Sequence, residues 1–170
     1  MKLEKQFKSE DNKLYFLDGK EFNARNNIEL DCEECLKDNS LENLNLSENS
    51  KILCISIAWS KIGLDEENYD ESFLAKLRDF LKSLEDKKNY AFILPLADKI
   101  PDSESEQENF IASFKHCARR IKDCTSIVGF AVPDCVNQNI FMEEVLAKHS
   151  HYIFFSKNPD LLKNKSIVEF

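Results

Sequence analysis

The sequence predicts an α/β fold in which parallel strands alternate with helices, preceded by a β-hairpin. Short, almost wholly apolar stretches are typical of parallel strands that are covered on both faces. Amphipathic segments with helical periodicity separate them. Near the N-terminus, Asp18-Gly19 lies between apolar-rich flanks, which is a common hairpin turn sequence. The four apolar stretches are residues 51–59, 90–97, 126–132 and 152–155.

The hairpin is expected first along the chain. We predict strands at residues 14–17 and 20–23, with a positive φ at both Asp18 and Gly19. Residues 1–12, which are charged throughout, are expected to be flexible. The segment 26–50 is rich in Asn, Glu and Leu, and its pattern fits either a short helix or an irregular surface segment.

Three helices are expected between the strands. The first covers residues 71–88, begins at a cap from Asp70 or Asn68, and has six apolar residues on one face. The second covers residues 103–122, where Ser103 and Glu106 form a capping box. The apolar faces are Phe73, Leu74, Leu77, Phe80, Leu81 and Leu84 in the first helix, and Phe110, Ile111, Phe114, Cys117, Ala118 and Ile121 in the second.

The C-terminal part continues the alternation. A third helix is expected at residues 137–149, Asn158-Pro159 opens a short helix, and residues 166–170 suit a last strand. We expect one domain over residues 1–170, with the alternation in residues 51–170. Two sheet architectures fit this pattern, namely a shortened TIM-barrel-like sheet and an open doubly wound sheet.

Composition limits the classes of binding partner that we expect. The formal net charge of −8 disfavours nucleic acid, and the only basic cluster of note lies at residues 115–120. The start, MKLEKQFKSEDNK, lacks the apolar core of a signal peptide, and no segment has the ~20 apolar residues that span a bilayer. We therefore expect a cytoplasmic protein without a membrane partner. Three glycines are too few for a phosphate-binding loop, so no cofactor is expected.

A candidate site lies where the strands end, because parallel strands bring their carboxyl ends to one edge of the sheet. Asp98 and Asp134 are the candidate catalytic carboxylates there, if burial separates their pKa values. The alternative is that strands end in polar residues because solvent begins there. The candidate ligand-binding rim is Trp59, Lys61, Asp98, Lys99, Asp134 and Lys157.

Cys32 and Cys35 form a Cys-x-x-Cys pair. Acidic neighbours disfavour the thiolates that redox chemistry requires. A structural zinc site needs two further ligands, and the sequence has no second motif that supplies them. Other parts of the chain could contribute a ligand only if the fold brought them close, namely His116, Cys117, His149 or His151.

The order of elements over residues 14–134 resembles the N-terminal half of a cellulase-like glycoside hydrolase of family five, a (β/α)8 barrel. LYFLDGKEFNARNN resembles the opening hairpin that closes the barrel floor. ISIAW, then NYDESFLAKLRDFLKSLEDKKNYAFILPLAD, resembles the second strand, the next helix and the third strand. ENFIASFKHCARRIKDCTSIVGFAVPD resembles the helix and fourth strand that end in the catalytic Asn-Glu-Pro.

The chain departs from that family at the positions that carry its chemistry. Ser56 or Ile57 stands where the family has an arginine, and Ala97-Asp98 where it has a histidine. Val132-Pro133-Asp134 replaces Asn-Glu-Pro, so Asp134 is one residue displaced. A retaining glycosidase needs two carboxyl groups about 5 Å apart.

We therefore expect a non-catalytic, glycoside-hydrolase-like protein that binds a small ligand, such as a carbohydrate, or a protein partner at its strand ends. The alternative is a small glycoside hydrolase or other hydrolase that uses Asp98 and Asp134. Because exposed strand edges need cover, a homodimer is a further expectation.

Overall fold

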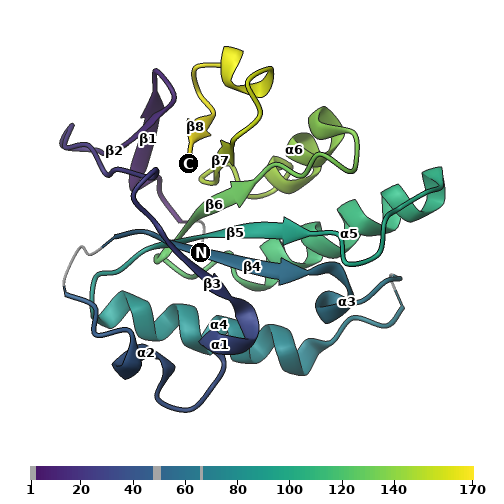
Figure 1. Ribbon diagram of the computed structural model, residues 1–170, viewed down its shortest axis with the longest axis horizontal. Helices are drawn as coiled ribbons and strands as arrows, with labels where there is room; N and C mark the ends of the chain where they lie inside the picture. Colours follow the sequence, from purple (N-terminus) through teal and green to yellow (C-terminus); the bar gives the residue numbers. More distant parts are fainter. Residues whose placement is uncertain (1–2, 48–50, 66) are drawn as a thin grey trace.

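The computed structural model describes residues 3–47, 51–65 and 67–170, and Figure 1 shows the arrangement of its elements. Strands and helices alternate along most of the chain after an N-terminal hairpin. The elements are β1 (Phe7–Glu10), β2 (Lys13–Phe16), β3 (Ile28–Asp31), α1 (Cys32–Cys35), α2 (Ser40–Asn43), β4 (Leu53–Ala58), α3 (Trp59–Ile62), α4 (Glu71–Asp86), β5 (Ala91–Leu96), α5 (Glu104–Arg120), β6 (Ile127–Ala131), α6 (Gln138–Leu146), β7 (Ile153–Ser156), the 3₁₀ helix η1 (Leu161–Lys163) and β8 (Val168–Glu169).

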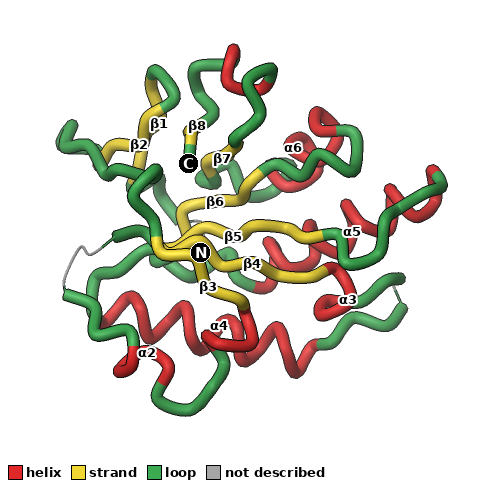
Figure 2. Tube along the Cα trace, viewed as in Figure 1, coloured by secondary structure: helices red, strands yellow, loops and turns green. Residues whose placement is uncertain are grey.

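Strands β3 to β8 form one parallel sheet whose spatial order is the order of the chain (Figures 1 and 2). A doubly wound sheet reverses its strand order at a switch point, and the described part of the chain contains no such reversal. The buried faces of α4, α5 and α6 pack into one core cluster, on one face of the sheet. The predicted barrel-like α/β fold is therefore confirmed over its doubly wound alternative.

The sheet is curled. Lys157 directly follows β7 and Glu29 lies on β3, yet Lys157 Nζ is 3.6 Å from Glu29 Oε1. In a flat sheet these strands would be four spacings apart, about 19 Å, which is beyond the combined reach of the two side chains. Arg25, before β3, also forms an ion pair with Glu169 of β8. The two edge strands therefore approach one another, although no backbone ladder joins them within the described residues.

Aromatic rings fill the inner face of the curl. Phe92 of β5 stacks on Phe155 of β7 with their centroids 4.2 Å apart, and Phe170 meets Phe92 edge-on at 5.0 Å. Between β5 and β7, strand β6 places only Gly129 and Ala131 in the rows of these residues. Because those two residues are small, rings from the strands on either side can meet over β6.

The hairpin β1–β2 covers the same inner face at the amino ends of the strands. Phe7 and Leu14 are buried in the inner cluster, and the ring of Phe7 lies edge-on to Tyr90, just before β5, at 4.9 Å. Asn12 in the hairpin turn donates its backbone N–H to Lys165 O and accepts from Glu169 N–H, both at 3.0 Å. The hairpin thus closes the floor of the curl and fastens the β8 edge.

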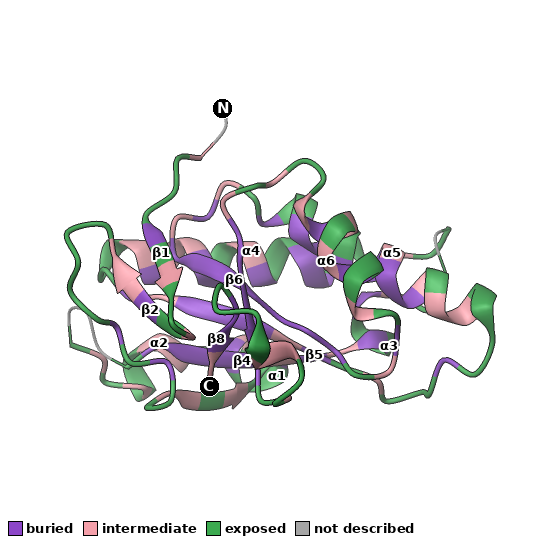
Figure 3. Cartoon of the chain, turned by 90° about the horizontal axis from the view of Figure 1, so that it is seen from above, coloured by how far each residue is buried: buried purple, intermediate pink, exposed green. Residues whose placement is uncertain are grey.

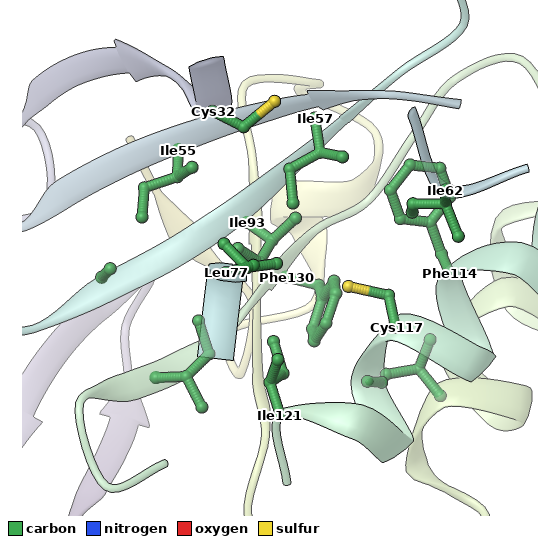
Figure 4. Packing of buried hydrophobic residues seen from close by; sticks show 14 of the residues in the cluster. Cys32, Ile55, Ile57, Ile62, Leu77, Ile93, Phe114, Cys117, Ile121 and Phe130 are labelled. Atoms are coloured by element: carbon green, nitrogen blue, oxygen red, sulfur yellow. The ribbon is translucent and has the colours of Figure 1, made fainter. Parts of the chain in front are cut away.

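The outer face of the sheet is covered by helices (Figure 3), and Figure 4 shows part of this packing. All twelve residues predicted for the buried faces of the first two long helices are buried. The Asp70 carboxylate accepts from Phe73 N–H at 2.9 Å and so caps α4. Ser103 Oγ caps α5 as predicted by accepting from Glu106 N–H at 3.1 Å, and the Glu106 carboxylate turns back and accepts from Asp102 N–H at 2.9 Å.

The hairpin region agrees with its prediction in part. At the predicted turn only Gly19 has a positive φ, of 94°, but the chain does turn back there, since Phe16 N–H donates to Lys20 O at 2.9 Å, Phe22 N–H donates to Leu14 O at 2.8 Å, and a bridge joins Tyr15 and Glu21. The sequence did not predict β1 or the two-residue turn at Asp11 and Asn12, whose φ values are 50° and 61°. Residues 7–10 were expected to be flexible and instead form β1, whereas residues 1 and 2 lie outside the described part.

The segment 26–50 agrees with its prediction in part, because the short helices α1 and α2 form, but Ile28–Asp31 also forms the edge strand β3 on β4, which was not predicted. Residues 48–50 of that segment lie outside the described part. Within residues 3–47, 51–65 and 67–170, no helix combines the length and apolar character needed to cross a membrane. The expected homodimer stays a prediction.

Gly129 provides a test of the inner packing. A Cβ at this position would lie 1.7 Å from Ile153 O, so Gly129→Ala must push β6 and β7 apart. We expect the free energy of unfolding to fall by about 3 kcal/mol or more, measured by urea denaturation. Gly19→Ala is the control, since it meets no atom within 4 Å and costs only about 1 kcal/mol of backbone strain. Equal losses in the two variants would contradict this packing.

Candidate functional site

The rim of the curled sheet is formed by the residues that follow the carboxyl ends of its strands. Trp59 begins α3 at the end of β4, but its side chain is only 1% exposed. The indole N–H donates to Ser113 Oγ at 3.1 Å, and Phe110 lies edge-on to the indole at 5.4 Å. Trp59 therefore anchors α3 to α5 in the core, and the prediction that it lines a ligand-binding rim is wrong.

Asp98 follows β5 and is held by Ser60, which follows β4. Its carboxylate accepts from the Ser60 backbone N–H at 3.1 Å and from the Ser60 hydroxyl. Partial burial acts to raise the pKa of Asp98, but the hydrogen bonds from Ser60 outweigh it, and the pKa lies below its usual value. A carboxyl group in this state is ionised at neutral pH and is poorly suited to act as a general acid.

Asp134 follows β6 and lies in an open cleft of about 500 Å³. Its Oδ1 accepts from Gln138 Nε2 at 2.7 Å and from Asn158 Nδ2 at 3.2 Å. Oδ2 accepts no hydrogen bond from the part of the chain that the structure describes. We call this feature the Asp134 cleft. Its lining residues are Asp134, Val136, Asn137, Gln138, Asn139 and Asn158.

The two candidate carboxylates lean away from one another. Asp98 of β5 is bound to Ser60 on the β4 side, whereas Asp134 of β6 is bound to Asn158 on the β7 side. Since β5 and β6 are neighbours, each acid turns toward the strand farther from the other acid. Asp98 does not line the Asp134 cleft. This arrangement does not form the facing pair of carboxyl groups that glycoside hydrolysis uses.

The rim lysines all have acidic partners nearby. Lys61 pairs with Glu33, which follows β3. Lys99 Nζ lies 2.6 Å from Glu106 Oε1. Lys157 pairs with Glu29 and also lies over the Phe170 ring, 4.8 Å from its centroid. The six predicted rim residues thus follow strand ends at one edge of the sheet, although Trp59 is buried there. The three lysines form ion pairs with glutamates of this chain.

Cys32 and Cys35 lie in the core beneath the rim. Burial, followed by the charge of Asp31, raises the pKa of Cys32 to about 11. Burial also raises the pKa of Cys35 to about 12. Figure 4 shows Cys117 in the same outer core, where burial raises its pKa to about 12 as well. Among the described residues, no group of three or more His, Cys, Asp and Glu side chains could hold a metal ion.

Comparison with known proteins gives a likeness of fold. No family model and no curated protein matches the chain. Among solved structures, the fold resembles that of a GH5_18 glycoside hydrolase from Bifidobacterium longum subsp. infantis, with a TM-score of 0.50 and 8% sequence identity. The match covers 81% of this chain and 40% of that protein, so the chain spans less than half of its length. The predicted resemblance is thus confirmed for the fold alone.

The amide side chains of the Asp134 cleft were not predicted from the sequence. Asn137, Gln138 and Asn139 are consecutive and lie at the start of α6, after the loop that follows β6, and Asn158 lies in the loop that follows β7. Three consecutive amides that follow a strand and its loop are a usable signal. Asn137 also caps α6 by accepting from Ile140 N–H at 3.0 Å, so one of the three amides has a structural role.

The thiols should be inert in the folded protein. At about pH 8 the buried cysteines are protonated and shielded, so a disulfide reagent should label them slowly, with the half-buried Cys135 reacting first. All six should react in denaturant. Rapid labelling of Cys32 or Cys35 in a folded Cys135→Ser variant would contradict the burial described above.

Asp98 should stabilise the fold in a pH-dependent way. Because its folded pKa is lowered, the stabilisation is full above the unfolded pKa and is lost as the pH falls through the folded pKa. Asp98→Asn should lower the free energy of unfolding at about pH 6 by less than about 1 kcal/mol, given its exposure. In urea titrations that difference should shrink below about pH 4, and it should be smaller in a Ser60→Ala background. An undiminished difference in acid would contradict the assignment.

Proposed function

We propose that this protein is non-catalytic and binds a small, hydroxyl-rich ligand in the Asp134 cleft. The observation that carries the proposal is the lining of the cleft, which contains four amide side chains and a single carboxylate. An amide both donates and accepts hydrogen bonds, as does a hydroxyl group, so such a lining suits a polyol or a sugar. The volume of about 500 Å³ falls within the range of small-molecule sites.

The free oxygen of the cleft's carboxylate supports binding at this position. Gln138 and Asn158 fix Asp134 through Oδ1 and leave Oδ2 available to accept from a ligand hydroxyl. A charged acceptor forms stronger hydrogen bonds than a neutral one. Held on two sides, the carboxylate loses little conformational freedom when a ligand binds.

The state of the second carboxylate argues against catalysis. Glycoside hydrolysis needs one protonated carboxyl group and a second carboxylate across the scissile bond. The lowered pKa of Asp98 disfavours it as the protonated acid, and Ser60 holds it on the β4 side while Asn158 holds Asp134 on the β7 side, so the two do not face one another across one bond. The likeness to a glycoside hydrolase fold keeps hydrolysis by Asp98 and Asp134 as the alternative, and the experiment below separates the two.

A panel of sugars and polyols, titrated by amide-detected NMR, tests the proposal. We expect saturable shifts at Asn137–Asn139, and a loss of affinity of at least about tenfold, or about 1.4 kcal/mol, in Asp134→Ala. Asn139→Ala should weaken the same ligand. Asp98→Ala is the matched control, because it removes a rim carboxylate outside the cleft, and it should leave affinity unchanged.

The same panel, offered as chromogenic glycosides, should show no turnover. Hydrolysis that both Asp98→Asn and Asp134→Asn abolish would establish the alternative. The absence of saturable binding by every member of the panel would reject the proposed ligand class.

A further inference from the structure

A charged hollow lies on the helical side of the protein between α5 and α6, which pack side by side (Figure 1). This α5–α6 groove has a volume of about 500 Å³. It shares no lining residue with the Asp134 cleft. We propose that the α5–α6 groove binds a small phosphate-bearing molecule that has an apolar ring.

Cations gather at the carboxyl-terminal end of the groove. Arg119 lies in the last turn of α5, and Lys148 and His149 follow α6. Neither Arg119 nor Lys148 forms an ion pair with any residue that the structure describes. This local excess of positive charge stands out on a chain whose formal net charge is −8.

The same cations also act on His149, which lines the groove beside them. Burial lowers the pKa of His149 first, and the positive charges of Lys122, Lys148 and Arg119 lower it further. Cations near the carboxyl ends of helices also complement the helix dipole. The dipole alone does not account for cations from two helix ends facing the same hollow.

The other charged groups of the groove are either paired or lie away from Arg119, and so do not cancel this excess. Lys115 of α5 forms an ion pair with Glu144 of α6 across the groove. His116 Nε2 lies 2.6 Å from Glu71 Oε1. Glu108 lines the groove four residues before Ala112, toward the amino end of α5, away from Arg119. An anion is therefore favoured at the end that Arg119 and Lys148 form.

The rest of the groove is suited to an apolar ring. Ile111 and Ala112 line it from α5, and Ile140, which is 48% exposed, lines it from α6. Tyr69 and His116 also line it and stack on one another, with centroids 4.2 Å apart and an angle of 20° between their planes. Apolar and flat surfaces next to a cationic end fit a ligand whose anionic group is attached to a ring.

Phosphate is the anionic group that this end fits best. The guanidinium group of Arg119 can donate two parallel hydrogen bonds to phosphate oxygens, and Lys148 adds a point charge from the other helix. A long nucleic acid is disfavoured by the overall negative charge and by Glu108 within the groove.

Phenyl phosphate and inorganic phosphate are suitable ligands for the test. Titrations followed through the His149 ring signals should show saturable binding of phenyl phosphate, at least about tenfold tighter than inorganic phosphate. Arg119→Gln/Lys148→Gln should weaken phenyl phosphate at least about tenfold. Ile140→Asn should reduce the preference for phenyl phosphate over inorganic phosphate.

Lys5→Gln/Lys8→Gln is the matched control, because it also removes two exposed positive charges, at the N-terminal end of the chain. It should change the affinity by less than about twofold. Equal weakening in the control and the groove variant would overturn the proposal, as would the absence of saturation up to about 10 mM phenyl phosphate. Binding of an acidic peptide but not of phenyl phosphate would also overturn it.

Discussion

The curl of the parallel sheet is the constraint on which the rest of the structure depends. The stacked rings of Phe92 and Phe155 draw β5 and β7 together over the small residues of β6. The ion pair between Lys157 and Glu29 spans the inner side of the curl. A parallel sheet must be covered on both faces, and here the helices cover the outside while aromatic rings and the hairpin fill the inside.

The curl brings the two rim carboxylates to one edge of the sheet but does not turn them toward one another. The parallel strands bring Asp98 and Asp134 to one rim, because parallel strands all end at the same edge of their sheet. Ser60 and Asn158 then hold the two carboxylates toward opposite sides. What remains at the rim is a cleft of amides around one carboxylate, which suits recognition of hydroxyl groups better than bond cleavage.

The sequence predicted the elements whose patterns are long and regular. The apolar residues on the buried faces of α4 and α5 were predicted one by one, because they recur with helical spacing, whereas the buried Ser113 of α5 was not predicted. The strand β3 was missed because Ile28–Asp31 alternates apolar and acidic residues over only four positions, in a segment rich in polar residues. The turn at Asp11-Asn12 was missed because it lies in a charged stretch, whereas the turn at Asp18-Gly19 has the stronger local signal.

The site was predictable only in part, for a physical reason. Strand ends are local features, so Asp98 and Asp134 could be assigned to the rim from the sequence. Their partners are tertiary contacts, since Ser60 is 38 residues from Asp98 and Asn158 is 24 residues from Asp134. The burial of Trp59 depends likewise on Ser113, 54 residues away. No local sequence pattern predicts contacts between residues that lie so far apart along the chain.

The most direct test of this account is whether the two rim carboxylates sense one another. The measurement is the titration of the Asp98 side-chain carboxyl carbon by NMR, in the wild-type protein and in Asp134→Asn. The account predicts a lowered pKa for Asp98 that the substitution leaves unchanged, because Ser60 sets it. A pKa raised above the usual value, or one that falls when Asp134 loses its charge, would show a coupled pair of acids and contradict the account.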